Sequence, residues 1–342
     1  MQAVRLTENG HFGLAEVARP EPGPGEILVR VEACGICGSD RHMVRGEYPT
    51  SRPVTLGHEF AGRIEQVGAG VTRLAAGDRV TGDPNIACGT CPACRAGRVN
   101  LCETLSAIGV NQDGGFADYL VMPEIQAYKL PEGMKAEHGA FCEPLACCLH
   151  GLDVARIAPG MRVAVLGGGV IGLLMVQLAR LAGAADVTLV TRQAARRSLA
   201  LAVGATTAFD PSAADPVAAL TAPEGAAPGG FDVVLECAGV AATFTQSLAL
   251  VRRGGTVVVF GVMPAGETVP VTPFDLLVRE VRLEGAYLNP MTHGRAVAMI
   301  ASGVLALDPL ISRRIPLKDV AETVLAPPAP GEIKVVAVPG LG

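Results

Sequence analysis

The chain has 342 residues, more than a single hydrophobic core usually supports, so we expect two domains. Hydrophobic residues make up 49% of it, which excludes an intrinsically disordered chain. The formal net charge of −5, without any basic run, argues against a nucleic-acid-binding protein.

The N-terminal segment and the cysteines bear on where the protein works. The sequence MQAVRLTENG has neither the charged n-region nor the apolar h-region of a signal peptide. The most apolar stretch, 163–179, contains three consecutive glycines and Gln177, which favours strand, turn and helix over a membrane span. Ten cysteines without a secretory signal indicate metal ligands rather than disulfides. We therefore expect a cytoplasmic protein with no membrane partner.

Residues 1–33 alternate between short apolar segments and Pro/Gly-rich turns, a pattern typical of strands in a compact β-barrel. The next stretch contains Cys37, His42, His58 and Glu59, which we expect on loops of this barrel. Thiolate, imidazole and carboxylate side chains are the ligand set of a zinc site. The alternative is a buried cysteine and a hydrogen-bonded histidine without metal, and it is weaker because a second cysteine cluster lies downstream.

That second cluster has the spacing C-x2-C-x2-C-x7-C and consists of Cys88, Cys91, Cys94 and Cys102. Four thiolates on one short loop can close a tetrahedral shell around zinc and leave no position open for chemistry. An iron–sulfur cluster also takes four cysteines, but this spacing lacks the long gaps and the Cys-Pro ending of the common cluster patterns. The sequence therefore predicts a structural zinc lobe at residues 88–102.

A helix is expected within residues 141–157. It begins near Glu143, since Pro144 is favoured in a first helical turn. Glu143 at this position is either a partner of the helix dipole or a further zinc-site carboxylate, and the residues alone do not choose between the two.

Residues 162–192 predict an apolar strand, a glycine turn, an apolar helix and a second apolar strand, which form one βαβ unit of a parallel sheet. Gly167, Gly169 and Gly172 make the pattern G-x-G-x-x-G between strand and helix. The first glycine permits the tight turn, the second lets a pyrophosphate approach, and the third lets the helix pack on the strand. The helix N-terminus then faces the phosphates, so this turn predicts a dinucleotide site.

More apolar strands with glycine-containing ends follow at 230–240 and 254–262, and the chain returns to the first domain from about Leu288. There we expect a helix at 293–304 and two terminal strands. Cofactor contacts are also expected at the glycine turn and at the ends of the later strands, at Val170, Ile171, Cys237, Gly261 and Val262.

The motifs CGICGSD-x-H, GHE, the four-cysteine lobe, EPLA and V-x-G-x-G-x-x-G occur in one order over nearly the whole chain. Together they resemble the zinc-dependent medium-chain dehydrogenases, and GHE with EPLA resembles the polyol branch that includes sorbitol, arabinitol and xylitol dehydrogenases. The resemblance implies an α/β protein with a doubly wound Rossmann domain at 151–287. This domain is inserted into a GroES-like β-barrel catalytic domain at 1–150 and 288–342. It also implies a homodimer or homotetramer.

The resemblance further implies that Cys37 and His58 bind the catalytic zinc directly, and that the carboxylates of Glu59 and Glu143 bind it directly or through water. It also implies that Ser39 and His42 form a proton path. The implied reaction is reversible hydride transfer between a secondary alcohol of a polyol or sugar and a nicotinamide cofactor.

Cofactor choice departs from the commonest pattern of that family. An acidic residue about 20 positions after the glycine turn binds the ribose of NAD. Here the corresponding residue is Thr191, followed by Arg192, with Arg196 and Arg197 one turn further on. A small residue beside arginine leaves room and charge for a 2′-phosphate, so we expect NADP rather than NAD. The alternative is that these arginines form a solvated helix face.

Other functions compete with a polyol dehydrogenase. One is a zinc dehydrogenase of the same fold for another secondary alcohol, such as a 3-hydroxy amino acid or a sugar phosphate. The others are a non-catalytic NADPH-binding zinc protein and a zinc hydrolase. The candidate substrate-pocket residues are Arg41, Arg45, Tyr48, Phe116 and Tyr287, but no pattern in the sequence fixes the shape of that pocket.

Overall fold

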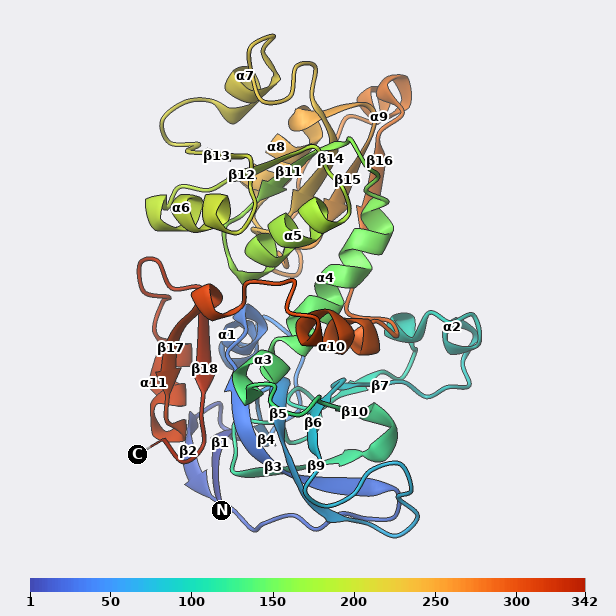
Figure 1. Ribbon diagram of the computed structural model, residues 1–342, viewed down its shortest axis with the longest axis vertical. Helices are drawn as coiled ribbons and strands as arrows, with labels where there is room; N and C mark the ends of the chain where they lie inside the picture. The colour runs from blue at the N-terminus through green and yellow to red at the C-terminus, as the bar shows by residue number, and fades with distance from the viewer. Residues whose placement is uncertain (342) are drawn as a thin grey trace. The chain divides into compact units, whose positions relative to one another are not determined.

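The computed structural model describes residues 1–341 and divides into two compact units. One unit consists of Met1–Ala146 and Asn289–Gly342, and the other of Cys147–Leu288. Figure 1 shows the two units as ribbons, with the first built mainly from strands and the second from a sheet with helices around it.

The first unit contains three sheets, and helices join their strands. Its strands are β1 (Gln2–Leu6), β2 (Phe12–Glu16), β3 (Glu26–Gly35), β4 (Val54–Thr55), β5 (Glu59–Val67), β6 (Arg79–Gly82), β7 (Asn85–Ile86), β8 (Ser106–Ala107), β9 (Tyr119–Pro123), β10 (Ala127–Lys129), β17 (Ile311–Ile315) and β18 (Lys334–Ala337). Its helices are α1 (Gly38–Arg45), α2 (Pro92–Arg95), α3 (Ala136–Ala140), the start of α4 (Cys142–Ala155), α10 (His293–Ala301) and α11 (Val320–Leu325).

The largest sheet of this unit joins the two ends of the chain. Its strand order is β10-β6-β5-β3-β18-β17, and β9 also pairs with β3. Gly35 at the end of β3 lies opposite Glu59 at the start of β5, and on its other side opposite Val336 of β18. This register brings residues from three distant parts of the chain to one end of the sheet.

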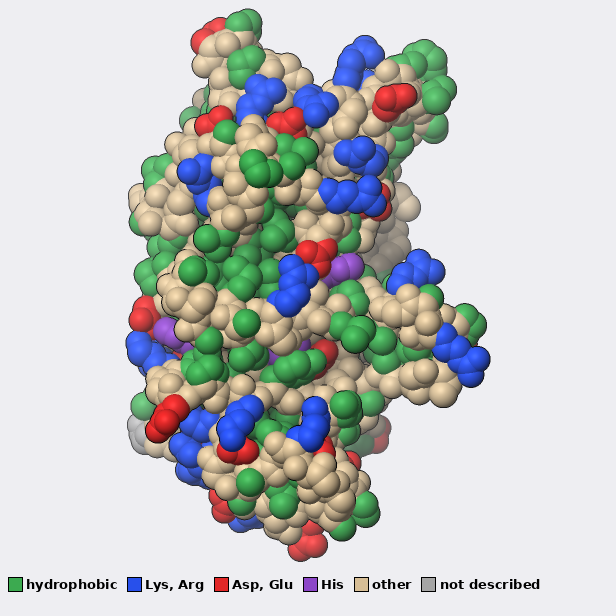
Figure 2. All heavy atoms as spheres, turned by 45° about the vertical axis from the view of Figure 1, so that its right-hand side comes forward, with side chains coloured by type: hydrophobic (Ala, Val, Ile, Leu, Met, Phe, Trp, Pro, Cys, Tyr) green, Lys and Arg blue, Asp and Glu red, His purple; other side chains and the backbone are tan. Residues whose placement is uncertain are grey.

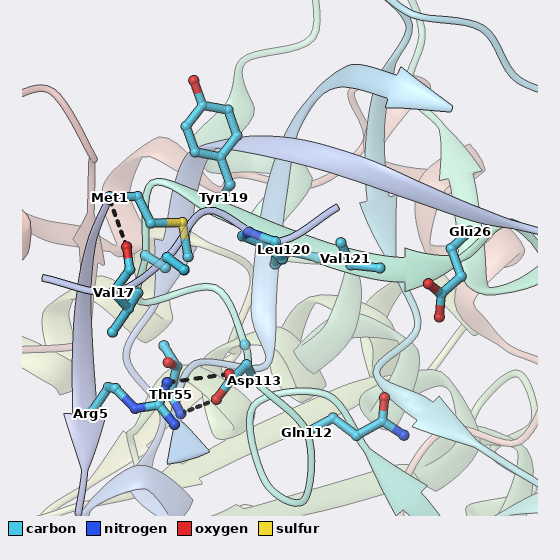
Figure 3. A pocket seen from close by; sticks show the side chains of 14 residues that line it. Met1, Arg5, Val17, Glu26, Thr55, Gln112, Asp113, Tyr119, Leu120 and Val121 are labelled. Carbon is cyan, nitrogen blue, oxygen red and sulfur yellow. Dashed lines mark hydrogen bonds and ion pairs between the residues drawn. The ribbon is translucent and has the colours of Figure 1, made fainter. Parts of the chain in front are cut away.

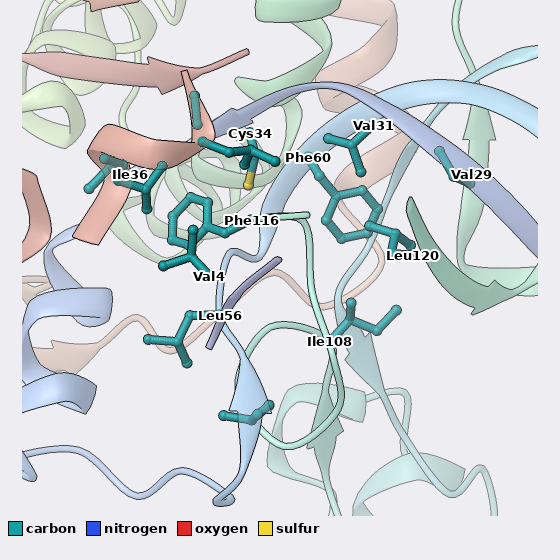
Figure 4. Close-up of a cluster of buried hydrophobic side chains, with 14 of the residues drawn as sticks. Val4, Val29, Val31, Cys34, Ile36, Leu56, Phe60, Ile108, Phe116 and Leu120 are labelled. Atoms are coloured by element: carbon teal, nitrogen blue, oxygen red, sulfur yellow. The ribbon is translucent and has the colours of Figure 1, made fainter. Parts of the chain in front are cut away.

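A large hydrophobic cluster lies in the interior of the first unit. Aromatic and branched side chains from β1, β3, β5, β9 and the segment before β9 meet there, among them Val4, Val29, Phe60, Leu120 and Phe116 (Figure 4). Each fully buried large side chain contributes roughly 1.5–3 kcal/mol through removal from water. The strands whose ends carry the candidate site are thereby held in place.

The second unit is a six-stranded parallel sheet with its own core. Its strands are β11 (Arg162–Leu166), β12 (Asp186–Val190), β13 (Thr207–Phe209), β14 (Phe231–Glu236), β15 (Val251–Val259) and β16 (Arg282–Gly285). Its helices are α5 (Val170–Leu181), α6 (Ala194–Ala202), α7 (Pro216–Thr221), α8 (Ala241–Leu250) and α9 (Pro273–Arg279).

The strands of this sheet lie in the order β13-β12-β11-β14-β15-β16, and all neighbours are parallel. Numbered within the unit, this order is 3-2-1-4-5-6, that of the doubly wound dinucleotide-binding fold. Helix α5 packs on β11 and β12, while α8 packs on β14 and β15. The order reverses between β11 and β14, and ligands bind such folds at the carboxyl ends of the strands beside that point.

Charged side chains of both signs are visible on the molecular surface (Figure 2). On the face that Figure 2 shows, basic and acidic side chains are interspersed rather than gathered by sign. Among the described residues, no helix combines the length and apolar character that a membrane crossing needs.

A cavity of about 370 Å³ lies between β1 and β9, lined by Arg5, Thr55, Asp113, Tyr119 and neighbours (Figure 3). It shares no residue with the metal-ligand clusters described below, so we assign no chemistry to it.

Candidate active site and metal centres

Helix α1 carries the first part of the candidate site, where we had expected a loop. The helix forms because Asp40, at its third position, accepts a hydrogen bond from the backbone N–H of Cys37 at 2.8 Å, and because Gly46 closes it in the left-handed conformation. Cys37 is therefore the N-cap residue, and Ser39 and His42 lie on the helix itself. Only two of its eight residues, Met43 and Val44, are apolar, and it lies inside a glycine-rich motif, which is why a search for repeated apolar positions missed it.

His58 and Glu59 reach Cys37 through a glycine turn and the start of β5. Gly57 has φ +98°, and a β-carbon there would lie 2.7 Å from the backbone nitrogen of Phe116, so only glycine fits. Ligand atoms of Cys37, His58 and Glu59 all lie within 4.8 Å of one another. We call these three residues the catalytic cluster.

The electrostatics of the catalytic cluster suit a cation. Burial alone would lower the pKa of His58, but the charge of Asp40 and the contact with Cys37 raise that pKa well above its usual value. His58 Nδ1 lies 3.4 Å from Asp40 Oδ1, and both atoms are buried without a well-aligned hydrogen bond among the described residues. A carboxylate behind a ligating imidazole orients the ring and raises its basicity. The donor set and its excess negative charge therefore fit zinc.

Lys334 is a member of this site that sequence reasoning did not find. Its ammonium lies 2.5 and 2.8 Å from the two oxygens of Glu59 and donates to the carbonyl of Ile36 at 3.0 Å. Side chains of both partners are almost fully buried, at 2% and 1% exposure. Burial lowers the pKa of Lys334, but the charges of Glu59 and Cys37 outweigh it and raise that pKa above its usual value. Lys334 thus balances one negative charge beside the candidate metal position.

The expected proton-path residues lie on one helix. Ser39 Oγ is 3.2 Å from His58 Nε2, whereas His42 Nδ1 is 2.6 Å from Glu47 Oε2. Ser39 and His42 are three positions apart on α1 and so share a face.

Glu143, in the first turn of α4, is buried and raises the pKa of Lys334 through its charge, but it lies outside the catalytic cluster.

The four cysteines of residues 88–102 also converge, with all their sulfur atoms within 4.8 Å of one another. Cys88 Sγ and Cys94 Sγ are 4.0 Å apart, close to the roughly 3.8 Å expected between two sulfurs on one tetrahedral zinc. The side-chain hydroxyl and backbone N–H of Thr90, with the backbone N–H of Cys91, lower the pKa of Cys88 to about 5. Burial and the neighbouring sulfurs instead raise the pKa of Cys94 to about 12, so a bound cation is needed to hold all four cysteines as thiolates. The convergence of the four sulfurs fits a closed zinc centre.

In the second unit, the glycine turn has the form that a pyrophosphate needs. Gly167 has φ +113°, and a β-carbon on Gly172 would lie 1.9 Å from the carbonyl oxygen of Gly167. Gly169 is the N-cap of α5, and the space where its β-carbon would lie is open. Val170 and Ile171 follow in the first helical turn. The N-terminus of this 12-residue helix therefore presents free N–H groups at the switch point of the sheet.

Thr191 and its arginines lie at the end of the next strand. Thr191 packs against Gly168, where an added β-carbon would lie 3.0 Å from the threonine side chain. Arg197 donates to the carbonyls of Thr191 and Arg192 and pairs with Asp210 at 2.9 Å. Arg192 is exposed. Arg197 therefore stabilises this strand end, while the side chain of Arg192 is exposed to solvent. Arg196 lies half-buried in the first turn of α6.

Two residues that we had considered for the substrate pocket have other roles. Phe116 is fully buried in the core of the first unit. Arg41 donates to the carbonyls of Val324 and Ala326 and lies 3.6 Å from Glu332, so it ties α1 to the end of α11.

Comparison with known proteins places the chain in a family. Residues 23–132 match the model of the alcohol dehydrogenase GroES-like domain, and residues 170–302 match that of the zinc-binding dehydrogenases. The chain belongs to the zinc-dependent medium-chain dehydrogenases. This confirms the expected enzyme class, the polyol branch and the pairing of a GroES-like domain with a Rossmann sheet.

Individual relatives of this dehydrogenase differ in substrate. It is 35% identical to a D-altritol 5-dehydrogenase of Agrobacterium fabrum, over 93% of this chain and 94% of the relative. It is also 33% identical to an L-threonine 3-dehydrogenase of Paraburkholderia phytofirmans, over 90% of each. A solved structure of a putative zinc-binding dehydrogenase from Sinorhizobium meliloti, bound to NADP, is 56% identical over 99% of both chains, with a TM-score of 0.97.

Proposed function

We propose that this dehydrogenase uses NADP(H) and zinc to interconvert a secondary alcohol of a polyol or sugar with the corresponding ketone. The observation that carries the proposal is the convergence of Cys37, His58 and Glu59, with the Ser39 hydroxyl 3.2 Å from His58. A hydroxyl at hydrogen-bond distance from a candidate metal ligand is suited to handle the proton of a bound alcohol.

In this proposal Cys37 and His58 hold the catalytic zinc, and Glu59 and Glu143 supply carboxylate oxygens directly or through water. Bound zinc supplies a Lewis acid for the substrate oxygen, and the nicotinamide supplies the hydride acceptor. Ser39 accepts the hydroxyl proton of the substrate and passes it along its helix face to His42. Glu47, 2.6 Å from His42, holds the imidazole that delivers the proton to solvent.

The cysteine lobe binds the second zinc, which stabilises the fold and takes no part in the reaction. Its support is the set of four converging sulfurs and the N–H groups that already face Cys88. Such metal binding is coupled to local folding. We also propose a cytoplasmic location, where thiols of this kind stay reduced.

NADP is the preferred cofactor in this proposal. The positive charge of exposed Arg192, with Arg196 one turn away, suits a 2′-phosphate, and Thr191 carries no charge that would repel it. The NADP in the related structure from Sinorhizobium meliloti supports the same choice.

A second copy of the chain is the proposed partner, in a homodimer formed by the second unit. β16 is an outer strand, and its free edge pairs with no other strand among the described residues. Next to it, α9 exposes Phe274 at 67% and Leu277 at 73%. An open edge beside exposed apolar side chains favours pairing with another chain. Light scattering gives the test: we expect a dimer for the wild type and a monomer for Leu277→Glu.

The experiment that tests the reaction is a panel of polyols, sugar phosphates and L-threonine with NAD and NADP, read at the nicotinamide absorbance. We expect the highest kcat/KM with a polyol. Turnover of L-threonine alone would replace polyol by 3-hydroxy amino acid as the substrate class. Cys37→Ser should abolish turnover with the best substrate and remove one zinc, and full activity in that variant would contradict the assignment.

A further inference from the structure

Glu236 is a buried carboxylate that neither the zinc sites nor the reaction uses. It is the last residue of β14, in the middle of the parallel sheet, and it is 0% exposed. None of the ion pairs among residues 1–341 includes it. A buried carboxylate without a cationic partner is costly unless hydrogen bonds satisfy its oxygens.

Those partners all belong to the segment that follows the strand. Oε1 accepts from the backbone N–H groups of Ala238 and Gly239, each at 3.0 Å, and from the hydroxyl of Thr243 at 2.6 Å. Oε2 accepts from Gly239 at 3.3 Å. Hydrogen bonds to a charged acceptor are stronger than neutral ones. The carboxylate therefore ties residues 238–243 back onto the end of the strand.

The segment fixed in this way touches two further strand ends. A β-carbon on Gly167 would lie 2.9 Å from the nitrogen of Ala238, and one on Gly261 would lie 2.1 Å from the nitrogen of Gly239. A β-carbon on Gly261 would also lie 2.7 Å from Glu236 Oε2. The backbones after β11, β14 and β15 thus pack in direct contact around one carboxylate, and Gly167 belongs to the pyrophosphate turn.

We propose that Glu236 is a positioning residue for the dinucleotide: its carboxylate fixes segment 237–239 against the glycine turn and Gly261, and so sets the shape of the backbone surface that the cofactor contacts. The inference rests on the proposed function, since it takes a nicotinamide dinucleotide as the ligand. Because the N–H groups of Ala238 and Gly239 point to Glu236, they are not donors to the cofactor phosphates. The N-terminus of α5 is then the main source of phosphate donors in this unit.

Glu236→Gln tests the proposal, because it keeps the size of the side chain but turns one acceptor into a donor that faces N–H groups. NADPH binding to the full-length enzyme is measured by calorimetry, together with KM and kcat. We expect the dissociation constant and the KM for NADP to rise at least tenfold, while kcat changes less than threefold.

Asp232→Asn is the matched control, since Asp232 lies near the other end of the same strand and also accepts a backbone N–H, from Arg162 at 2.7 Å. It should lower the melting temperature and leave NADPH affinity unchanged. If Glu236→Gln does not fold, Thr243→Val removes one bond to the same carboxylate and should weaken NADPH binding two- to fivefold.

The outcomes distinguish a failure of this inference from a failure of the proposed function. Wild-type affinity in folded Glu236→Gln, or in Thr243→Val when the former is unfolded, overturns this inference and leaves the proposed function intact. An equal loss of affinity in Asp232→Asn also overturns it, because the effect is then general destabilisation. If the wild type binds neither NADPH nor NADH, the proposed function fails and this inference fails with it.

Discussion

Single buried residues determine the electrostatics of the catalytic cluster. In the first unit Lys334 pairs with Glu59 beside the catalytic cluster, and Asp40 faces His58. Each of these groups is buried, where an unpaired charge costs far more than at the surface. The consequences of removing one partner are therefore large and depend on whether a metal ion is bound.

Lys334→Met should make stability dependent on zinc. Removal of one partner from a buried pair costs about 3–5 kcal/mol, because the other charge is left unpaired. A bound dication beside Glu59 compensates part of that loss, so we expect a large drop in melting temperature for metal-free protein and a smaller one for zinc-loaded protein. Lys135→Met is the control, since its pair with Asp308 is exposed and worth at most about 1 kcal/mol. Equal losses with and without zinc would contradict the coupling.

Because of His293, we expect the folded protein to lose stability in acid. It is fully buried against Tyr128, neither ring nitrogen has a hydrogen-bond partner among the described residues, and burial lowers the pKa of His293 to about 3. Below the unfolded pKa of about 6.5 the unfolded chain binds a proton that the folded chain does not. Stability should therefore fall as pH drops from about 6.5 towards 3, by at most about 1.4 kcal/mol per pH unit.

His293→Phe removes the titrating imidazole and with it this pH dependence of the free energy of unfolding. The melting temperature of the variant should therefore fall less than that of the wild type between pH 7 and pH 5. Melting curves of the two proteins at both pH values give the comparison, and carboxylate effects common to both cancel in the difference. Parallel pH dependences would show that His293 takes up its proton in the folded state.

Thr191 and Arg192 should determine the cofactor preference. Arg192 can meet a 2′-phosphate with charge-assisted hydrogen bonds of about 1.5–3 kcal/mol each. An acid at position 191 would repel the phosphate and accept the free ribose hydroxyls. Thr191→Asp with Arg192→Ala should shift kcat/KM from NADP towards NAD by at least tenfold, mostly through KM. Arg192→Lys keeps the charge and should retain the preference; a wild type that clearly prefers NAD would show that Arg192 is only a solvated residue.

At the scale of elements, the pairing of β3 with β5 places the carboxylate of the catalytic cluster. Gly35 lies opposite Glu59, and a β-carbon on Gly35 would lie 2.0 Å from Glu59 Oε2. No left-handed backbone angle is involved, so the conflict is purely steric. The empty position beside Gly35 is what lets the Glu59 carboxylate reach both Lys334 and the cluster.

Gly35→Ala should therefore displace Glu59, break its pair with Lys334 and lower catalytic zinc occupancy to less than half. Gly38→Ala is the control on the same stretch: its β-carbon would meet nothing within 4 Å, and alanine favours the start of α1. Zinc content and melting temperature of both variants give the answer. Full zinc retention in Gly35→Ala would mean that Glu59 has no part in metal binding.

Elements with local patterns could be predicted from the sequence, and those made by distant contacts could not. The glycine turn with its flanking strand and helix, and the close spacing of Cys88 to Cys102, are legible because each lies within a short stretch. Helix α1 depends on one capping carboxylate, Asp40, inside a glycine-rich motif. Lys334 reaches Glu59 across 275 positions in sequence, and only the β3–β18 register brings it there.

At the scale of the whole molecule, the candidate metal ligands and the candidate nucleotide-binding residues belong to different units. The catalytic cluster and the cysteine lobe lie within Met1–Ala146, whereas the glycine turn, Thr191 and Glu236 lie within Cys147–Leu288. Each unit has its own hydrophobic core. A domain with its own core can keep its fold when another loses a stabilising ligand.

Removal of zinc should therefore abolish activity while the NADPH dissociation constant changes less than about threefold. Metal binding at the closed cysteine lobe is coupled to folding, so chelation should lower the first melting transition, that of the unit formed by Met1–Ala146 and Asn289–Gly342. The transition of the second unit should still rise with added NADPH, by the mass action of a ligand that binds only the folded state. Calorimetric scans of chelated and zinc-loaded protein, with and without NADPH, measure both effects. Loss of NADPH binding on chelation would mean that the nucleotide site depends on the first unit, and would contradict the independence of the two units.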